Sequence, residues 1–225
     1  MKFGTWALAA GLLAISGCGL TDRIGNTLHG IAPVRGSGAQ KSESRKVGAF
    51  TKISSKGAAD VHVTIGPTQS VVVRTDANLL PIVSTKVEGG ELIIEPTKPY
   101  TSSGGVVVTI VVPKLIGLSL LGSGNATVSR LSSPSFNVSL AGSGNVTLDG
   151  VVSKFESSIT GSGDVRAYGL AADTVDASVQ GSGNSEVAPK RTLKASIQGS
   201  GNIEYKGAPK VDAHVLGSGS VQSAN

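Results

Sequence analysis

Carboxylates are the residues of this sequence with the most versatile chemistry, because they can act as general acids or bases and can bind cations. Two of them, Glu186 and Glu204, each follow the first glycine of a Gly-Ser-Gly tripeptide by five residues. Side by side on an outward face they would form either a solvated pair or a weak cation site. Glycosidases need a matched acid and base, and a nucleophilic serine needs a histidine and a carboxylate beside it. Neither arrangement emerges from the sequence, so we predict that the protein is not an enzyme and has no catalytic residue, cofactor or metal.

The composition excludes several other classes of protein. A single cysteine excludes a disulfide framework and a cysteine-rich zinc site. Hydrophobic residues make up 39% of the 225 residues and the net charge is only +5, which does not fit charge-driven disorder. Basic residues gather at 41–56 and 190–194, where they suit anionic glycans. Nucleic-acid binders usually add aromatic stacking platforms, and four Phe, three Tyr and one Trp are few, so we expect no nucleic acid.

The only cysteine, Cys18, is placed for a different chemistry. It follows Lys2 and an apolar run over 6–15, which is too short to span a bilayer and is typical of a secretory signal. Ile15-Ser16-Gly17-Cys18 resembles a bacterial lipobox, which implies cleavage before Cys18 and its lipidation; a plain signal peptide with a chance cysteine is the alternative. Several acyl chains would give a stable membrane anchor. Residue 19 is glycine rather than aspartate, which favours the outer membrane over the inner.

The elements that position all these residues are repeats. Gly-Ser-Gly tripeptides recur with spacings of 18–20 residues, and they begin at Gly122, Gly142, Gly161, Gly181, Gly199 and Gly217. Before each tripeptide, apolar residues alternate with polar ones, as in Phe136, Val138 and Leu140. This period of two predicts a strand with one buried face. A second short strand follows each tripeptide, so each repeat reads as strand, corner, strand and return loop.

Stacking is required, because one such repeat cannot bury its apolar row alone. Equivalent strands stacked in register give parallel sheets, and parallel connections are overwhelmingly right-handed. The sequence therefore predicts an all-β, right-handed parallel β-helix or β-solenoid with rungs of 18–20 residues.

The corners explain the glycines. Glycine adopts positive φ without a steric penalty, so we expect Gly144 and Gly163 to need backbone angles that are costly for other residues. Asparagines after the tripeptides could form an amide ladder along the stack; Asp164 would interrupt it and should be exposed or paired. The predicted structural corner residues are Asp60, Gly122, Gly124, Asn125, Gly142, Gly144, Asn145, Gly161, Gly163, Asp164, Gly181, Gly183, Asn184, Gly199, Gly201, Asn202, Gly217 and Gly219.

The whole chain divides into three parts. Residues 1–17 are the expected signal peptide, and 18–45 the lipidated cysteine with a flexible tether. Residues 46–225 are the β domain, in which 46–112 form a more irregular cap and 113–225 the repeats. Within the cap, Glu88-Gly89-Gly90-Glu91 predicts a hairpin, and the β-branched run over 106–112 predicts a strand buried on both sides.

Several of these motifs together resemble a known family. Gly57-Ala-Ala-Asp60-Val61, the Gly-Gly hairpin and the serial Gly-Ser-Gly-Asn corners, over residues 46–220, are similar to the head GIN domain of the auto-transporter adhesin family. That resemblance implies a secreted or surface-anchored bacterial β-solenoid and supplies no catalytic motif.

We therefore expect a non-enzymatic, lipid-anchored protein of the cell envelope that serves as an adhesin or interaction scaffold. A polysaccharide-binding or polysaccharide-cleaving β-helix is the alternative, and an acidic cluster on one sheet would favour it. The expected partners are the membrane, through the lipid, and a surface glycan or envelope protein. The rung over 211–222 shows no capping pattern, so we also expect weak self-association or partner docking there.

Overall fold

The computed structural model describes residues 32–224, and residues 33–225 form one compact unit. The predicted signal peptide, the lipidation site at Cys18 and most of the expected tether lie outside the described residues. Among the described residues, regular structure consists of β-strands and one 3-10 turn, η1 (Leu80–Ile82), and no helix is long and apolar enough to cross a membrane.

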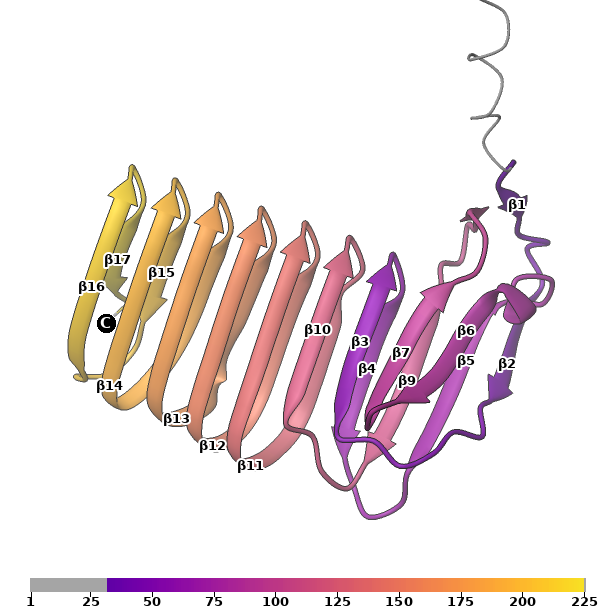
Figure 1. Cartoon of the computed structure of the whole chain (residues 1–225), viewed down its shortest axis with the longest axis horizontal. Coiled ribbons are helices and arrows are strands. Elements are labelled where there is room, and N and C mark those ends of the chain that lie inside the picture. The colour runs from indigo at the N-terminus through magenta and orange to yellow at the C-terminus, as the bar shows by residue number, and fades with distance from the viewer. Residues whose placement is uncertain (1–31, 225) are drawn as a thin grey trace, which may run out of the picture. The chain divides into compact units, whose positions relative to one another are not determined.

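The repeats form a two-faced parallel solenoid, as predicted (Figure 1). Its strands are β10 (Gly117–Gly122), β11 (Ala126–Gly142), β12 (Asn145–Gly161), β13 (Asp164–Gly181), β14 (Asn184–Gly199), β15 (Asn202–Tyr205), β16 (Lys210–Gly217) and β17 (Ser220–Ser223). Each long strand from β11 to β14 lies first in the back face of one rung and then, after the return bend, in the front face of the next. The first glycines of successive corners are register partners, so equivalent residues form straight rows along the stack.

The rungs nearest the N-terminus are not stacked in sequence order. β3 (Lys52–Gly57) and β4 (Asp60–Ile65) form a rung that pairs with β10 and β11 on one side. On its other side lie β7 (Glu91–Pro96) and β9 (Val107–Val112), which come later in the chain. The earlier rung is therefore enclosed between two later ones.

Antiparallel strands close this end of the stack. β6 (Val83–Glu88) pairs with β7 through the predicted Gly-Gly hairpin, and β5 (Ser70–Asp76) pairs with β9. β2 (Gln40–Ser44) then pairs with β5 as the outermost strand of the back face, and the two-residue strands β1 (Val34–Arg35) and β8 (Tyr100–Thr101) pair with each other.

Two expectations for this region need correction. Residues 40–44, which we had assigned to the tether, form β2; all five are polar and exposed, so backbone pairing with β5 holds the strand without any apolar row. The run over 106–112 is not buried on both sides, because Thr109 is exposed while Val107 and Val111 are half-buried. One face of β9 thus meets the core and the other meets solvent.

The inward rows form one continuous core. In the front face, Phe136 and Phe155 are register partners and both are buried, and Val175 and Leu193 continue the same row. Full burial of each large apolar side chain contributes about 1.5–3 kcal/mol. The predicted inward residues before the tripeptides are buried except at the two ends of the repeats, where Ile116 is half-buried and the last rung is largely exposed.

Candidate functional site

The corners have a geometry that differs from our expectation in one respect. The first glycine of each tripeptide has positive φ, for example 134° at Gly142 and 122° at Gly161, whereas Gly144 and Gly163 do not. The second glycine is needed for close approach instead, since a Cβ on Gly144 would overlap the carbonyl oxygen of Gly124 in the neighbouring rung. Gly163 stands in the same relation to Gly144. Both glycines of a corner are thus required: close approach to the neighbouring rung excludes a Cβ at each, and the first also has positive φ.

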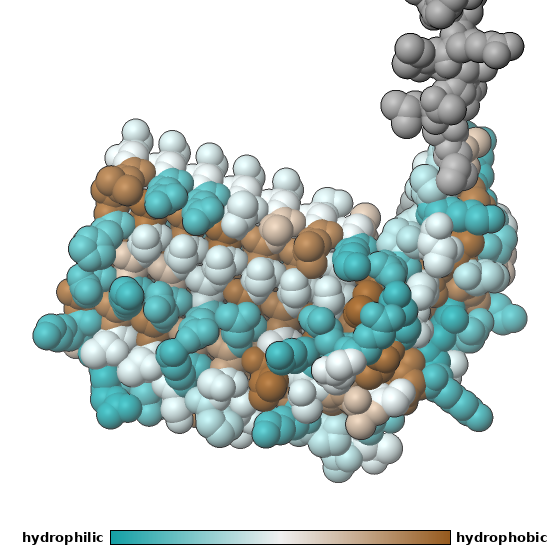
Figure 2. Space-filling model, viewed as in Figure 1, coloured by the Kyte–Doolittle hydropathy of each residue, from teal (hydrophilic) through white to brown (hydrophobic). Residues whose placement is uncertain are grey.

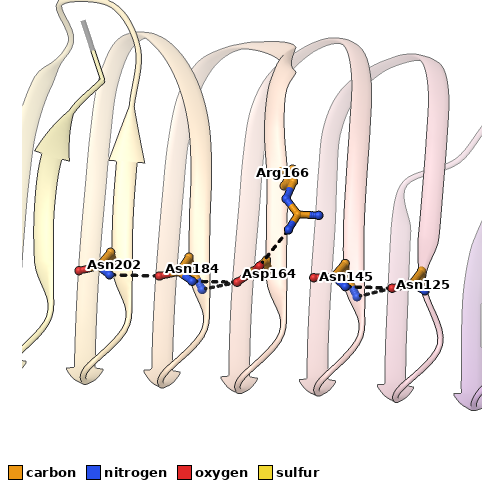
Figure 3. Close-up of polar contacts among 6 residues, drawn as sticks. All are labelled: Asn125, Asn145, Asp164, Arg166, Asn184 and Asn202. Atoms are coloured by element: carbon orange, nitrogen blue, oxygen red, sulfur yellow. Dashed lines mark hydrogen bonds and ion pairs between the residues drawn. The ribbon is translucent and has the colours of Figure 1, made fainter.

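The amide ladder predicted at these corners is present, but it is divided in two (Figure 3). In the first segment, Asn125 donates from its backbone N and from Nδ2 to Asp60 Oδ1, at 2.9 and 3.0 Å. Asn145 repeats both bonds to Asn125 Oδ1, at 3.1 and 3.0 Å. Each of these asparagines thus donates to the corner side chain of the preceding rung in the stack.

The second segment begins at Asp164. Asn184 donates its backbone N and Nδ2 to Asp164 Oδ1 at 3.1 and 2.9 Å, and Asn202 Nδ2 donates to Asn184 Oδ1 at 3.1 Å. A carboxylate has no N–H to donate, so an aspartate can begin a ladder and cannot continue one. Arg166 Nη2 pairs with Asp164 Oδ2 at 3.1 Å, as expected for an interruption. The corner side chains therefore satisfy one another, which indicates a structural role.

The outward side of the front face carries a row of serines. Ser54, Ser119, Ser139, Ser158, Ser178 and Ser196 are successive register partners, and all except the buried Ser54 are at least partly exposed. Figure 2 shows that side chains of similar hydropathy form rows along the stack on this face. The five serines within the repeats each precede a tripeptide by three residues, so their spacing was visible in the sequence. The sequence did not show whether these serines form a binding surface or only separate the core positions of a strand.

Charged side chains flank the serine row. The adjacent row runs Asn137, Glu156, Asp176, Lys194 and Asp212. Lys154 pairs with Glu156, which lowers the pKa of that carboxyl and raises the pKa of the lysine. Near the C-terminal rungs, Lys154, Asp176, Lys194, Lys210 and Asp212 line a shallow hollow of about 360 Å³. A row of hydroxyls beside a row of mostly charged side chains thus gives the front face many polar groups for a partner.

The back face brings the predicted carboxylate pair together, because Glu186 and Glu204 are register partners. With Asp164 and Arg166 they line a hollow of about 150 Å³. Glu204 accepts hydrogen bonds from Tyr168 Oη at 3.2 Å and Gln222 Nε2 at 2.9 Å. Burial, together with the Glu204 carboxylate, raises the pKa of Tyr168 to about 12. Over residues 32–224, no three His, Cys, Asp or Glu side chains are grouped to hold a metal.

Beside this hollow lies a larger one, of about 430 Å³, lined by Tyr168, Pro189, Lys190 and Lys206 among others. Lys206 Nζ lies 4.2 Å from the centre of the Tyr168 ring, a cation–π contact. An aromatic ring beside polar side chains is the arrangement that a sugar can use.

One serine, histidine and aspartate do meet, on the last rungs of the front face. Ser196 is the register partner of His214, whose Nε2 lies 3.6 Å from Asp212 Oδ1. The side chains of His214 and Asp212 are both exposed, and their separation exceeds a hydrogen bond. The buried, oriented base that activates a nucleophile is not formed.

Comparison with solved structures places this fold among bacterial proteins described as adhesins. A putative adhesin from Bacteroides fragilis aligns with a TM-score of 0.69 at 21% identity, over 84% of this chain and 99% of that one. A putative lipid binding protein from Parabacteroides distasonis aligns with a TM-score of 0.53 at 22% identity, over 86% and 100%. At these identities the likeness shows the fold alone. No curated protein matches the chain in sequence.

The sequence itself matches a family profile over residues 49–209, which spans the cap from just before β3 and nearly all of the repeats. The chain therefore belongs to the family described as putative auto-transporter adhesin, head GIN domain.

Proposed function

We propose that this protein is a non-enzymatic, lipid-anchored adhesin or interaction scaffold of the bacterial cell envelope, held at the outer membrane through Cys18. The observation that carries the binding role is the front face, where five solvent-accessible serines of the repeats lie in register beside a row of mostly charged side chains. Rows spaced by about 4.8 Å repeat the same weak contact several times, which favours extended partners over small ones. Membership of an adhesin family supports a place at the cell surface.

The anchor rests on the lipobox-like Ile15-Ser16-Gly17-Cys18. The compact unit begins at residue 33, so the 14 residues 19–32 separate Cys18 from the folded domain. At roughly 3.3 Å per extended residue, this segment is long enough to hold the solenoid clear of lipid headgroups.

The front-face proposal is tested by binding of residues 33–225 to arrays of surface glycans and envelope proteins. In one variant, Ser139, Ser158 and Ser178 are replaced by lysine; in the matched control, Thr127 and Thr147 on the back face are replaced by lysine. We expect the front-face variant to lose at least tenfold in affinity for any ligand found and the control to change less than twofold. Equal binding by the front-face variant and the wild type would contradict the proposal.

A second candidate is polysaccharide binding on the back face, which the grouping of Tyr168, Lys206 and the Glu186–Glu204 pair favours. Tyr168→Ala would remove the ring, whereas Tyr168→Phe would keep the ring and lose only the bond to Glu204. If sugars stack on this ring, the alanine variant loses binding to acidic polysaccharide and the phenylalanine variant keeps most of it. If the same face cleaves its ligand, wild-type protein releases new reducing ends and Glu186→Gln does not.

A further inference from the structure

The two ends of the solenoid differ in how they meet solvent. At the N-terminal end the outermost strands are β2 and β6, whose exposed residues include Lys41, Glu43, Lys86 and Glu88. Charged side chains on an edge strand oppose pairing with another chain. This end is therefore protected against association.

The opposite end exposes large apolar residues beside its charged ones. β16 pairs with β14, β17 pairs with β15, and no strand of the described residues lies on their outer edges. Val215 is 40% exposed, whereas its row neighbours Ile197 and Val179 are fully buried at 0%. Leu216 is 69% exposed.

The sequence of β16 is complementary to itself in an antiparallel register. With Ala213 opposite its own copy, Val211 faces Val215 of the other chain, and Asp212 faces His214. Directly opposed residues of antiparallel strands lie on the same side of the sheet. The inward row would thus meet apolar residues alone, and each outward carboxylate would meet an imidazole.

We propose that two copies of this chain associate through their C-terminal rungs, with β16 paired antiparallel to β16 about a two-fold axis at Ala213. This contact is isologous, so it closes after two copies. A head-to-tail contact would instead place β16 against the charged strands of the other end and would extend into a filament. The inference is independent of the ligand proposed above.

A cysteine at the two-fold axis tests the register. Residues 33–225 suit this experiment because they contain no cysteine and form one compact unit, and the solved relatives, matched over 99–100% of their chains, fold as this domain alone. Opposed Cα atoms of antiparallel strands lie about 4.5–5.5 Å apart, within the range of about 4.4–6.8 Å that a disulfide spans. We expect mild oxidation to convert most Ala213→Cys protein into a covalent dimer.

Two cysteine controls separate this register from random collision. Leu216→Cys lies on the same exposed strand, but the two copies would be six residues apart, or about 20 Å. Thr160→Cys lies exposed on an interior rung. Neither variant should form a covalent dimer under the same oxidation. Crosslinking of Leu216→Cys as fast as Ala213→Cys would overturn the register.

Sedimentation of the uncrosslinked protein tests the association itself. The average mass of the wild type should rise toward twice the monomer mass with concentration, and Val215→Lys should remain at the monomer mass. Leu121→Lys is the matched control, because Leu121 is 41% exposed on an interior rung of the same face. Circular dichroism establishes that both variants fold. A wild type that remains monomeric at all concentrations, with no crosslink at Ala213→Cys, would overturn the proposal.

Discussion

At the scale of single residues, both glycines of each corner lack room for a side chain, but only the first has positive φ. Gly163 has ordinary backbone angles but no room for a side chain, since an added Cβ would overlap the Gly144 carbonyl oxygen and approach Leu140 Cδ2 to 2.9 Å. We expect Gly163→Ala to lower the free energy of unfolding by about 1–3 kcal/mol, because backbone must move. Gly48→Ala, with nothing within 4 Å and no positive φ, is the control. Equal denaturant midpoints for the two variants would contradict this account of the corner.

The ladder interruption gives a second residue-scale prediction. Asp164→Asn would supply an amide that can donate to Asn145 and can still accept from Asn184, which would join the two segments. The substitution also removes the ion pair with Arg166, which is exposed and therefore contributes little to stability. We expect stability to rise by about 0.5–1.5 kcal/mol, the net value of one hydrogen bond, as measured by urea denaturation. Asn145→Asp should do the reverse, because it removes a donor and sets two carboxylates side by side; a loss of stability in Asp164→Asn would refute the ladder argument.

At the scale of elements, each rung contacts chiefly its two neighbours, so the stack should tolerate the loss of one. Deletion of residues 182–199 would join Gly181 to Ser200 and bring Asn202 beside Asp164. Asp164 Oδ1, which accepts from Asn184 in the intact chain, would then accept from Asn202. We expect a folded, less stable protein whose denaturant m-value falls by roughly a tenth, because m scales with the surface exposed on unfolding. Deletion of nine residues from the same segment, half a rung, would place corner glycines beside strand residues of the neighbouring rung. We expect this variant to lose cooperative unfolding. A fold that collapses in the full-rung deletion would show that the rungs are not interchangeable.

The elements also show what the sequence could predict. Alternation and fixed spacing located every repeat strand, because both are local properties of the chain. The enclosure of β3 between β7 and β10 was not predictable in the same way, since parallel partners leave no local mark of their order. The close approach at Gly144 and the serine row depend likewise on the neighbouring rung. β2 escaped notice because its polar residues carry no alternation.

At the scale of the whole molecule, the anchor proposed at Cys18 would decide where the solenoid works. We expect Cys18→Ala to prevent incorporation of labelled fatty acid and either to release the protein from membranes or to leave an uncleaved precursor. Cell fractionation with palmitate labelling measures this, and Cys18→Ala in a strain that expresses another lipoprotein controls for the labelling. A variant that is processed and membrane-bound without acyl label would show that the anchor lies elsewhere.

The enclosed rung also sets an order of events for a chain that emerges N-terminus first. β3 and β4 cannot be covered on the cap side until β7 and β9 have been made, so the first stable nucleus must wait until about residue 112. From that point each additional 18–20 residues can add a rung to a finished edge, without waiting for the remainder of the chain. We therefore expect rungs to be added one at a time during synthesis, so that a single unfinished edge is exposed at the growing side of the stack.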